Sequence, residues 1–410
     1  MDAIEELLTR GVENIIPNKE KLRALLASGK KLNVYLGIDP TATQIHLGHA
    51  VPLRKLNAFA QTGHTVTFLI GDFTALIGDT SDKESERPIL TSAQIEKNFQ
   101  TYKQQAQKLL DFSKVKVRHN SEWLKKLAFE DIIKLTYHFS AGDFYSRELI
   151  KKRLTEGSHV GLHEILYPVM QGYDSYFMDT DIQLGGTDQT FNMQAGRVLQ
   201  KDLRNKESFI IANGFLEGTD GRKMSKTWGN AIWLDDPPNE MFGKVMSLRD
   251  ELIIQYFTLA TNLPMNEVKE IERQLKSGEN PMTYKKKLAF KIVSELHDSQ
   301  SAKGAQGAFE AVHQTGDISW MTSSLSSLPT IQRDNISFRG IASGASIAAG
   351  TVPEFVSSKS EFKRLANQNA IEILKPNLNE PINVKQDSKI RVEEGDIIKI
   401  GKKTHLKIKT

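Results

Sequence analysis

The spacing of apolar residues along the chain alternates between a strand period and a helix period. Residues 33–38 form a short apolar run of the kind that builds a buried strand, and residues 64–70 form a second run that is partly β-branched. Between them, residues 47–62 repeat their apolar side chains at helical spacing, and two short amphipathic helices precede the first run. The order strand, loop, helix, strand predicts a βαβ unit.

This alternation continues to about residue 230. The pattern predicts further strands at 115–119, 181–184 and 208–212, with helices at 92–112 and 189–200 among them. Strands that alternate with helices favour an α/β fold with a doubly wound parallel sheet, as in Rossmann-like domains. Because ligands of such sheets bind beyond the carboxyl ends of the strands, the candidate site consists of the loops at residues 37–49, 71–87 and 185–189.

The rest of the chain is organised differently. After Trp233 the pattern is helical, most clearly at 251–260, 265–275 and 285–296, whereas 316–350 is rich in Ser, Thr and Gly. A small α+β unit follows, with a helix at 360–367 and short strands at 371–374, 389–392 and 397–409. We therefore predict a Rossmann-like domain at 1–230, an all-helical domain at 231–320, a linker at 321–350 and a small domain at 351–410.

The composition agrees with a multi-domain protein. The 410 residues exceed one ordinary domain, and 39% apolar with 25% charged residues allow large cores beneath a solvated surface. The absence of cysteine excludes disulfides and thiolate zinc sites. The first residues carry no signal-peptide pattern, and no stretch approaches the roughly 20 apolar residues of a membrane span. We expect a cytoplasmic protein without membrane contact.

The net charge of +4 is unevenly distributed. Residues 351–410 hold 12 Lys or Arg against 8 Asp or Glu, whereas the preceding 350 residues hold 42 of each. A basic module on a neutral body indicates an appendage that contacts a polyanion. Charge alone, however, favours an ordinary solvated surface.

Two histidines occupy the turn between the first predicted strand and its helix. His46 and His49 lie three residues apart on either side of Gly48, so both rings can face one ligand. A helix amino terminus attracts phosphate, and imidazole donors there would stabilise charge on a phosphoryl group in transfer. A surface histidine pair is an equal alternative for so short a pattern. A metal site is not favoured, because no third ligand is near, and we expect no protein-bound metal.

A second basic motif follows the last predicted strand of the sheet. Lys223 and Lys226 lie in a loop at 221–230 that has a glycine near each end. Such a loop can bring two ammonium groups to a leaving pyrophosphate in the transition state. Taken alone, the motif is better explained as an ordinary exposed basic loop.

Together and in this order, the two motifs resemble the HIGH and KMSKS signatures of class I aminoacyl-tRNA synthetases. The blocks at 35–42, 76–79, 167–174 and 185–189 resemble those of bacterial tyrosyl-tRNA synthetases, and the similarity covers essentially the whole chain. The resemblance implies activation of L-tyrosine with ATP and Mg²⁺, transfer to tRNA(Tyr), and a homodimer. The sequence departs from the family at Asp82, where a glycine is common, and this changes the charge of that loop. Leu47 and Thr227 are mild departures within the two signatures.

The resemblance also implies roles for individual residues. For tyrosine, Tyr35 and Asp174 would hold the phenol, and the ammonium would be held by Asp79, Tyr167 and Gln171. The contacts to ATP and adenylate would come from Gly37, Asp39, His46, His49, Gly186, Asp188, Gln189 and Lys226. The phosphates in reaction would meet Thr41, His46, His49, Lys83, Arg87, Lys223 and Lys226.

The tail resembles a small RNA-binding domain that also occurs in a ribosomal small-subunit protein. The similarity lies at 358–365 and 395–403, and it implies RNA contacts by Lys359, Lys363, Arg364, Lys402 and Lys403.

Two alternative functions of the whole chain remain at this point. A tryptophanyl-tRNA synthetase would lack both the Tyr35 and Asp174 pair and the basic tail. A synthetase-derived RNA-binding or splicing protein would not need the histidine and lysine motifs.

Overall fold

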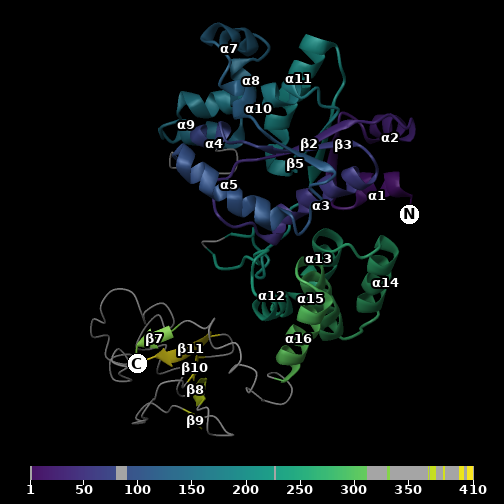
Figure 1. Ribbon diagram of the computed structural model, residues 1–410, viewed down its shortest axis with the longest axis vertical. Coiled ribbons are helices and arrows are strands. Elements are labelled where there is room, and N and C mark those ends of the chain that lie inside the picture. Colours follow the sequence, from purple (N-terminus) through teal and green to yellow (C-terminus); the bar gives the residue numbers. More distant parts are fainter. Residues whose placement is uncertain are drawn as a thin grey trace. The chain divides into compact units, whose positions relative to one another are not determined.

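The computed structural model describes residues 2–79, 90–225 and 228–311, together with the short segments 330–332, 368, 370–374, 382–383, 397–400 and 404–409 (Figure 1). The chain divides into two compact units, Met1–Phe309 and Glu310–Thr410. Among the described residues, no helix is both long and apolar enough to cross a bilayer.

The first unit is built on a six-stranded sheet in the order β1-β6-β5-β2-β3-β4. Its strands are β1 (Val12–Ile16), β2 (Asn33–Ile38), β3 (Thr65–Ile70), β4 (Val115–His119), β5 (Ile182–Gly186) and β6 (Phe209–Asn213). From β2 to β6 all pairings are parallel, which confirms the predicted sheet. The sequence prediction missed β1, which pairs antiparallel with β6 at the edge. A register shift between Val12 and Asn14 breaks the alternation that would have marked this strand.

Helices cover both faces of this sheet, as a doubly wound fold requires (Figure 1). The helices α3 (Leu47–Gln61) and α5 (Ser92–Ala106) lie on one side, and α10 (Leu162–Phe177) and α11 (Thr190–Arg204) on the other. The inner strands are therefore largely buried on both sides, and β6 is buried at every position, whereas the edge strands β1 and β4 are mostly exposed or half-buried. This burial explains why the inner strands are continuous apolar runs rather than alternating ones.

The remaining helices of this part are short. The chain begins with α1 (Ala3–Thr9) and α2 (Lys19–Ala27), which confirm the two predicted amphipathic helices. The predicted helix at 92–112 ends earlier, because the backbone turns after Ala106. The other helices before α10 are α4 (Thr74–Ile77), α6 (Ser121–Leu124), α7 (Phe129–Thr136), α8 (Ala141–Tyr145) and α9 (Glu148–Thr155).

The chain after the sheet is helical, as its periodicity predicts. The helices are α12 (Pro238–Met246), α13 (Ile253–Ala260), α14 (Met265–Lys276), α15 (Pro281–Leu296) and α16 (Ser299–Glu310). Their buried residues, such as Tyr256 and Leu288, belong to the same apolar cluster as Leu47 and Phe59 of α3. The helical part is thus packed onto the α3 side of the sheet through a continuous core.

The second unit contains a five-stranded sheet in the order β7-β11-β10-β8-β9. Its strands are β7 (Thr330–Gln332), β8 (Ile371–Leu374), β9 (Ile382–Asn383), β10 (Ile397–Ile400) and β11 (Thr404–Lys409). The strand predicted at 371–374 is confirmed, and the run 397–409 forms an antiparallel pair. β7 lies within the stretch predicted as a linker. The predicted helix at 360–367, the strand at 389–392 and the tail residues Lys359, Lys363, Arg364, Lys402 and Lys403 lie outside the described residues.

Candidate active site

The predicted site residues gather where β2 and β5 end. Tyr35 and Gly37 lie on β2, and the loop that follows carries Asp39 and Thr41 before α3 begins. Gly186 ends β5 and leads into a 3-10 turn at Thr187–Gln189. The helix α10 carries Tyr167, Gln171 and Asp174, each about one turn from the next. Adjacent parallel strands thus deliver these loops to one edge of the sheet.

Asp174 is a buried carboxylate with two hydrogen-bond donors. Trp123 donates from Nε1 to Oδ1 at 2.7 Å, and Asn120 donates from Nδ2 to Oδ2 at 3.1 Å. Burial is the main reason that the pKa of Asp174 is raised to about 8. The negative charges of Asp39 and Asp72 add to this increase, whereas the hydrogen bonds from Trp123 and Asn120 oppose it. Trp123 and Asn120 were not among the predicted residues, because they lie in a segment without a recognisable motif.

Tyr35 lies close to this carboxylate. Its side chain is 4% exposed, and its hydroxyl donates to Oε1 of Gln183 at 3.1 Å. Burial raises the pKa of Tyr35 well above its usual value, and the charge of Asp174 adds to the effect. The predicted phenol-binding pair is therefore brought together, and Gln183 is a further buried polar residue beside Tyr35 that the sequence did not indicate.

Asp39 accepts hydrogen bonds from two hydroxyl groups. Tyr167 donates to Oδ2 at 2.9 Å, and Thr74 donates to Oδ1 at 2.7 Å. Asn120 also donates to the Thr74 hydroxyl at 3.0 Å, so a continuous chain of hydrogen bonds joins Asp39 to Asp174. A Cβ atom on Gly71 would lie 1.9 Å from Asp39 Oδ1, so a residue with a side chain would clash at this position. Thr74 and Gly71 are thus further site residues.

A second polar group forms around Asp79. Gln189 donates from Nε2 to Asp79 Oδ2 at 2.8 Å, and Asn192 donates to Gln189 Oε1 at 3.2 Å. The negative charge of Asp79 also acts on Arg147, which partly offsets the lowering of the Arg147 pKa by burial. A hydrogen bond therefore joins Asp79, which was predicted to bind the ammonium of tyrosine, to Gln189, which was predicted to bind the nucleotide.

Gly186 provides a bare stretch of backbone between two side chains. A Cβ atom there would lie 2.4 Å from Asp188 Oδ1 and 3.6 Å from the ring of Phe215. Phe215 is 46% exposed, and the Nζ of Lys223 lies 5.4 Å from its ring centroid. Phe215 therefore borders both predicted nucleotide-binding segments, although its own position gave no sequence signal.

His46 and His49 face each other at the start of α3. Their ring centroids lie 3.8 Å apart with an interplanar angle of 22°, and the His46 N–H donates to His49 Nδ1 at 3.4 Å. A neutral His49 therefore carries its proton on Nε2. Burial lowers the pKa of His46 to about 2, with contributions from the charges of His49 and Lys223. At neutral pH His46 is an uncharged imidazole.

Backbone hydrogen bonds join the histidine turn to residues 232–234, which follow the lysine loop. The Leu47 N–H donates to Ile232 O, and the Leu234 N–H donates to Ile45 O, both at 2.9 Å. The ring of Trp233 also lies 5.7 Å from that of His46. The two signature motifs, far apart in sequence, are thus neighbours.

Asn230 holds the lysine loop in shape. Its side chain is 2% exposed and accepts from the Ser225 N–H at 2.8 Å. It also donates to Asp220 Oδ1 at 2.8 Å and to Lys223 O at 3.2 Å. The backbone around Lys223 is therefore fixed from inside the loop. Lys226, Thr227, Asp82, Lys83 and Arg87 lie outside the described residues.

Solved structures similar to this chain include two tyrosyl-tRNA synthetases. The enzyme of Archaeoglobus fulgidus complexed with L-tyrosine has a TM-score of 0.60 and 24% identity, covering 75% of this chain and 100% of that chain. The C-terminally truncated mitochondrial enzyme of Aspergillus nidulans has a TM-score of 0.65 and 21% identity, covering 76% and 94%. These likenesses show a shared fold.

Sequence comparison identifies the family. Residues 27–314 match the family model of the class I tRNA synthetases (W and Y). A tyrosine–tRNA ligase of Carboxydothermus hydrogenoformans is 40% identical over 411 residues, covering 98% of this chain and 97% of that protein. A tyrosine–tRNA ligase of Thermotoga maritima is 39% identical, covering 98% and 96%. The model spans tryptophan and tyrosine enzymes alike, but these relatives are tyrosine ligases. This chain therefore belongs to the tyrosine–tRNA ligase family of class I tRNA synthetases.

Proposed function

We propose that the residues gathered at the ends of β2 and β5 perform both steps of the tyrosine–tRNA ligase reaction. In the first step the carboxylate of tyrosine attacks the α-phosphate of ATP, which forms tyrosyl-adenylate and releases pyrophosphate. In the second step a ribose hydroxyl of the terminal adenosine of tRNA(Tyr) takes the acyl group. No covalent bond to the protein is needed, so catalysis rests on positioning and on stabilisation of charge.

Tyr35 and Asp174 would select tyrosine by its phenol. A hydroxyl that both donates and accepts can satisfy Asp174 and Tyr35 together. Phenylalanine would offer no hydrogen bond to Asp174 or to Tyr35, and placing its apolar ring against these two buried polar groups is costly. Asp79, Tyr167 and Gln171 would hold the ammonium, because a carboxylate and neutral acceptors suit a cation.

The nucleotide would lie along Gly186. Asp39, Asp188 and Gln189 would accept from its ribose and adenine donors, and Gly37 and Gly186 would let it approach the backbone. The exposed ring of Phe215 beside Gly186 supports a flat base at this position.

His46 and His49 would bind the phosphates with Thr41. Because His46 is neutral, it would act as a hydrogen-bond donor and not as a fixed charge. Positive charge would come from Lys223, and we expect Lys226, Lys83 and Arg87 to add to it. One such preorganised donor contributes about 3 kcal/mol to a transition state.

Mg²⁺ would enter with ATP, bound to phosphate oxygens. The part of the chain that the structure describes has no group of three His, Asp or Glu side chains placed to hold a metal ion. Mg²⁺ usually keeps several waters and is bound largely through substrate phosphates. The residues around His46 are neutral or cationic, which suits a metal ion that is bound by the phosphates of ATP rather than by the protein.

The other parts of the chain would bind tRNA. We expect the helical domain, predicted at 231–320, to contact the anticodon, and the basic domain at 351–410 to contact other features of the tRNA. Because ATP and tRNA are cytoplasmic, we expect the protein to act there.

An apolar stripe supports a homodimer. Phe129, Ile133 and Tyr137 recur every four residues along and just after α7, and they are 76%, 38% and 80% exposed. Exposed apolar residues on one helix face mark an interface, and we propose a second copy of this chain as its occupant. Phe129→Glu should convert the dimer to a monomer in analytical ultracentrifugation. A monomeric wild-type protein would contradict the proposal.

The observation that carries the proposal is the buried Asp174 carboxylate beside Tyr35. The test is exchange of labelled pyrophosphate into ATP by the purified protein with single amino acids. We expect exchange with tyrosine and none with phenylalanine or tryptophan. Absence of exchange with every amino acid would overturn the proposed activity, and tryptophan-dependent exchange would overturn the specificity.

A further inference from the structure

A nearly buried ion pair connects the histidine helix to the helical part of the chain. Arg54 of α3 donates from Nη1 to Glu295 Oε2 of α15 at 2.7 Å, and the two side chains are 9% and 12% exposed. Arg54 Nη1 also donates to Asn262 Oδ1 at 2.8 Å, and the Asn262 N–H donates to both carboxylate oxygens of Glu295, at 2.9 and 3.1 Å. Lys291 adds a contact of 3.3 Å to Glu295. One carboxylate thus joins α3 to the turn between α13 and α14.

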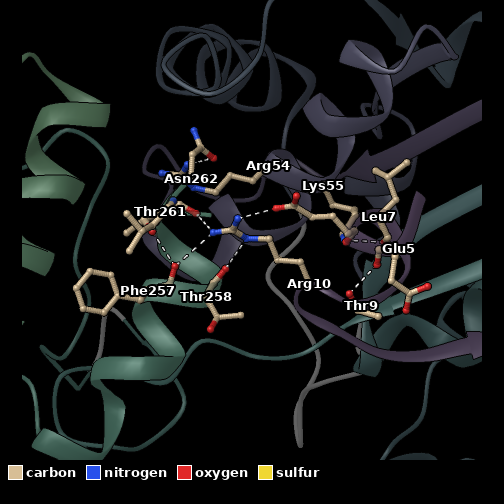
Figure 2. A network of polar contacts seen from close by, with 12 residues as sticks. Glu5, Leu7, Thr9, Arg10, Arg54, Lys55, Phe257, Thr258, Thr261 and Asn262 are labelled. Atoms are coloured by element: carbon tan, nitrogen blue, oxygen red, sulfur yellow. Dashed lines mark hydrogen bonds and ion pairs between the residues drawn. The ribbon is translucent and has the colours of Figure 1, made fainter. Parts of the chain in front are cut away.

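A second arginine reaches the same turn from the amino-terminal segment. Figure 2 shows Arg10 directed at the end of α13, where it donates to Thr258 O at 3.0 Å, Phe257 O at 3.4 Å and Thr261 O at 2.6 Å. The last carbonyls of a helix lack partners within the helix and carry partial negative charge, which a guanidinium satisfies. The end of α13 is therefore held by Arg10 and the turn after it by Arg54.

The pair is poorly suited to a purely stabilising role. Among the described residues, Nε and Nη2 of Arg54 are buried without a hydrogen-bond partner, and burial lowers the pKa of this guanidinium. Buried donors without partners cost free energy, and a buried ion pair is often matched by apolar residues of similar size. What apolar residues would not supply is a directional contact that sets the position of one helix against another.

The position of α3 matters because its first turn carries the two histidines. Arg54 lies two turns after Leu47, about 10 Å along the same helix, with Pro52 between them. We propose that Arg54 is a positioning residue whose contact with Glu295 and Asn262 sets the place of His46 and His49 from the helical part of the chain. The inference rests on the proposed function of these histidines, and it adds that the α13–α15 helices control their geometry.

The test compares Arg54→Met, Glu295→Met and the double variant, with Lys285→Met of α15 as control. Lys285 forms an ion pair with Asp250 and is not part of the contact with α3. We expect each single variant to lower both the melting temperature and the kcat of tyrosine-dependent exchange, the latter at least tenfold, with KM for tyrosine unchanged. The double variant should regain the melting temperature but not kcat. Recovery of both together would overturn the positioning role.

A second readout does not depend on activity. The imidazole NMR signals of His46 and His49, assigned with His46→Gln and His49→Gln, should move in Arg54→Met and in the double variant but not in Lys285→Met. Unchanged signals in the double variant would overturn the inference. Absence of exchange by the wild-type protein would instead overturn the proposed function, so the two failures are distinguishable.

Discussion

Tyr167 donates a hydrogen bond from its hydroxyl to Oδ2 of Asp39 at 2.9 Å, which links the helix expected to bind tyrosine to the loop expected to bind the nucleotide. Both the tyrosine and the ATP sites should therefore depend on this contact. Tyr167→Phe leaves Asp39 with one donor fewer while keeping the ring. We expect kcat/KM to fall roughly tenfold for each substrate in pyrophosphate exchange, since a hydrogen bond to a charged group contributes about 1.5–3 kcal/mol. A loss for tyrosine alone would contradict the link.

Trp123 should matter for tyrosine binding without touching the nucleotide. Trp123→Phe removes the 2.7 Å donor to Asp174 but keeps a ring that can stack on Phe177, now 4.6 Å away. We expect KM for tyrosine to rise roughly tenfold with KM for ATP unchanged. Phe177→Leu is the control, because it alters the stacking and no hydrogen bond. An equal effect of both variants would show that packing, not the hydrogen bond, is responsible.

Asp174 should make folding stability fall with rising pH. Its pKa rises from 3.8 to about 8 in the folded state, so between these values the folded protein binds more protons than the unfolded chain. Stability must then decrease as pH rises through this window and level off above it. Asp174→Asn cannot titrate, so its melting temperature should fall less than that of wild type between about pH 5 and pH 8. Parallel curves would refute the prediction, and exposed Asp143→Asn serves as control.

Asn230 should support catalysis through the shape of the lysine loop. Asn230→Ala removes the hydrogen bond from the Ser225 N–H and the hydrogen bond to Lys223 O. We expect kcat of exchange to fall at least tenfold, because Lys223 is then less well placed, with KM for tyrosine within about twofold of wild type. Steady-state exchange kinetics measure both, and a change in KM for tyrosine at constant kcat would argue against this role.

Phe215 should contribute to ATP binding. Replacement by alanine removes the ring beside Gly186 and Lys223. We expect KM for ATP to rise about three- to tenfold, in keeping with aromatic contacts of about 0.5–1.5 kcal/mol, and KM for tyrosine to stay constant. Met282→Ala, at another exposed apolar position on α15, is the matched control. An unaltered KM for ATP in Phe215→Ala would remove Phe215 from the site.

The sequence by itself determined the elements and the two signatures. Strand and helix periods are local properties, so β2 and β4 were predicted with their observed bounds, and the histidine turn was placed at the start of α3. The edge strand β1 was missed, because its irregular register hides the alternation.

Only the tertiary structure decided which residues support the predicted ones. Trp123 and Asn120 meet Asp174 across about fifty positions, and Arg54 meets Glu295 across 241. Such contacts depend on how strands and helices pack, and no residue spacing encodes them. The buried state of Asp174 and the neutral state of His46 arise in the same way, because desolvation exists only once the chain is folded.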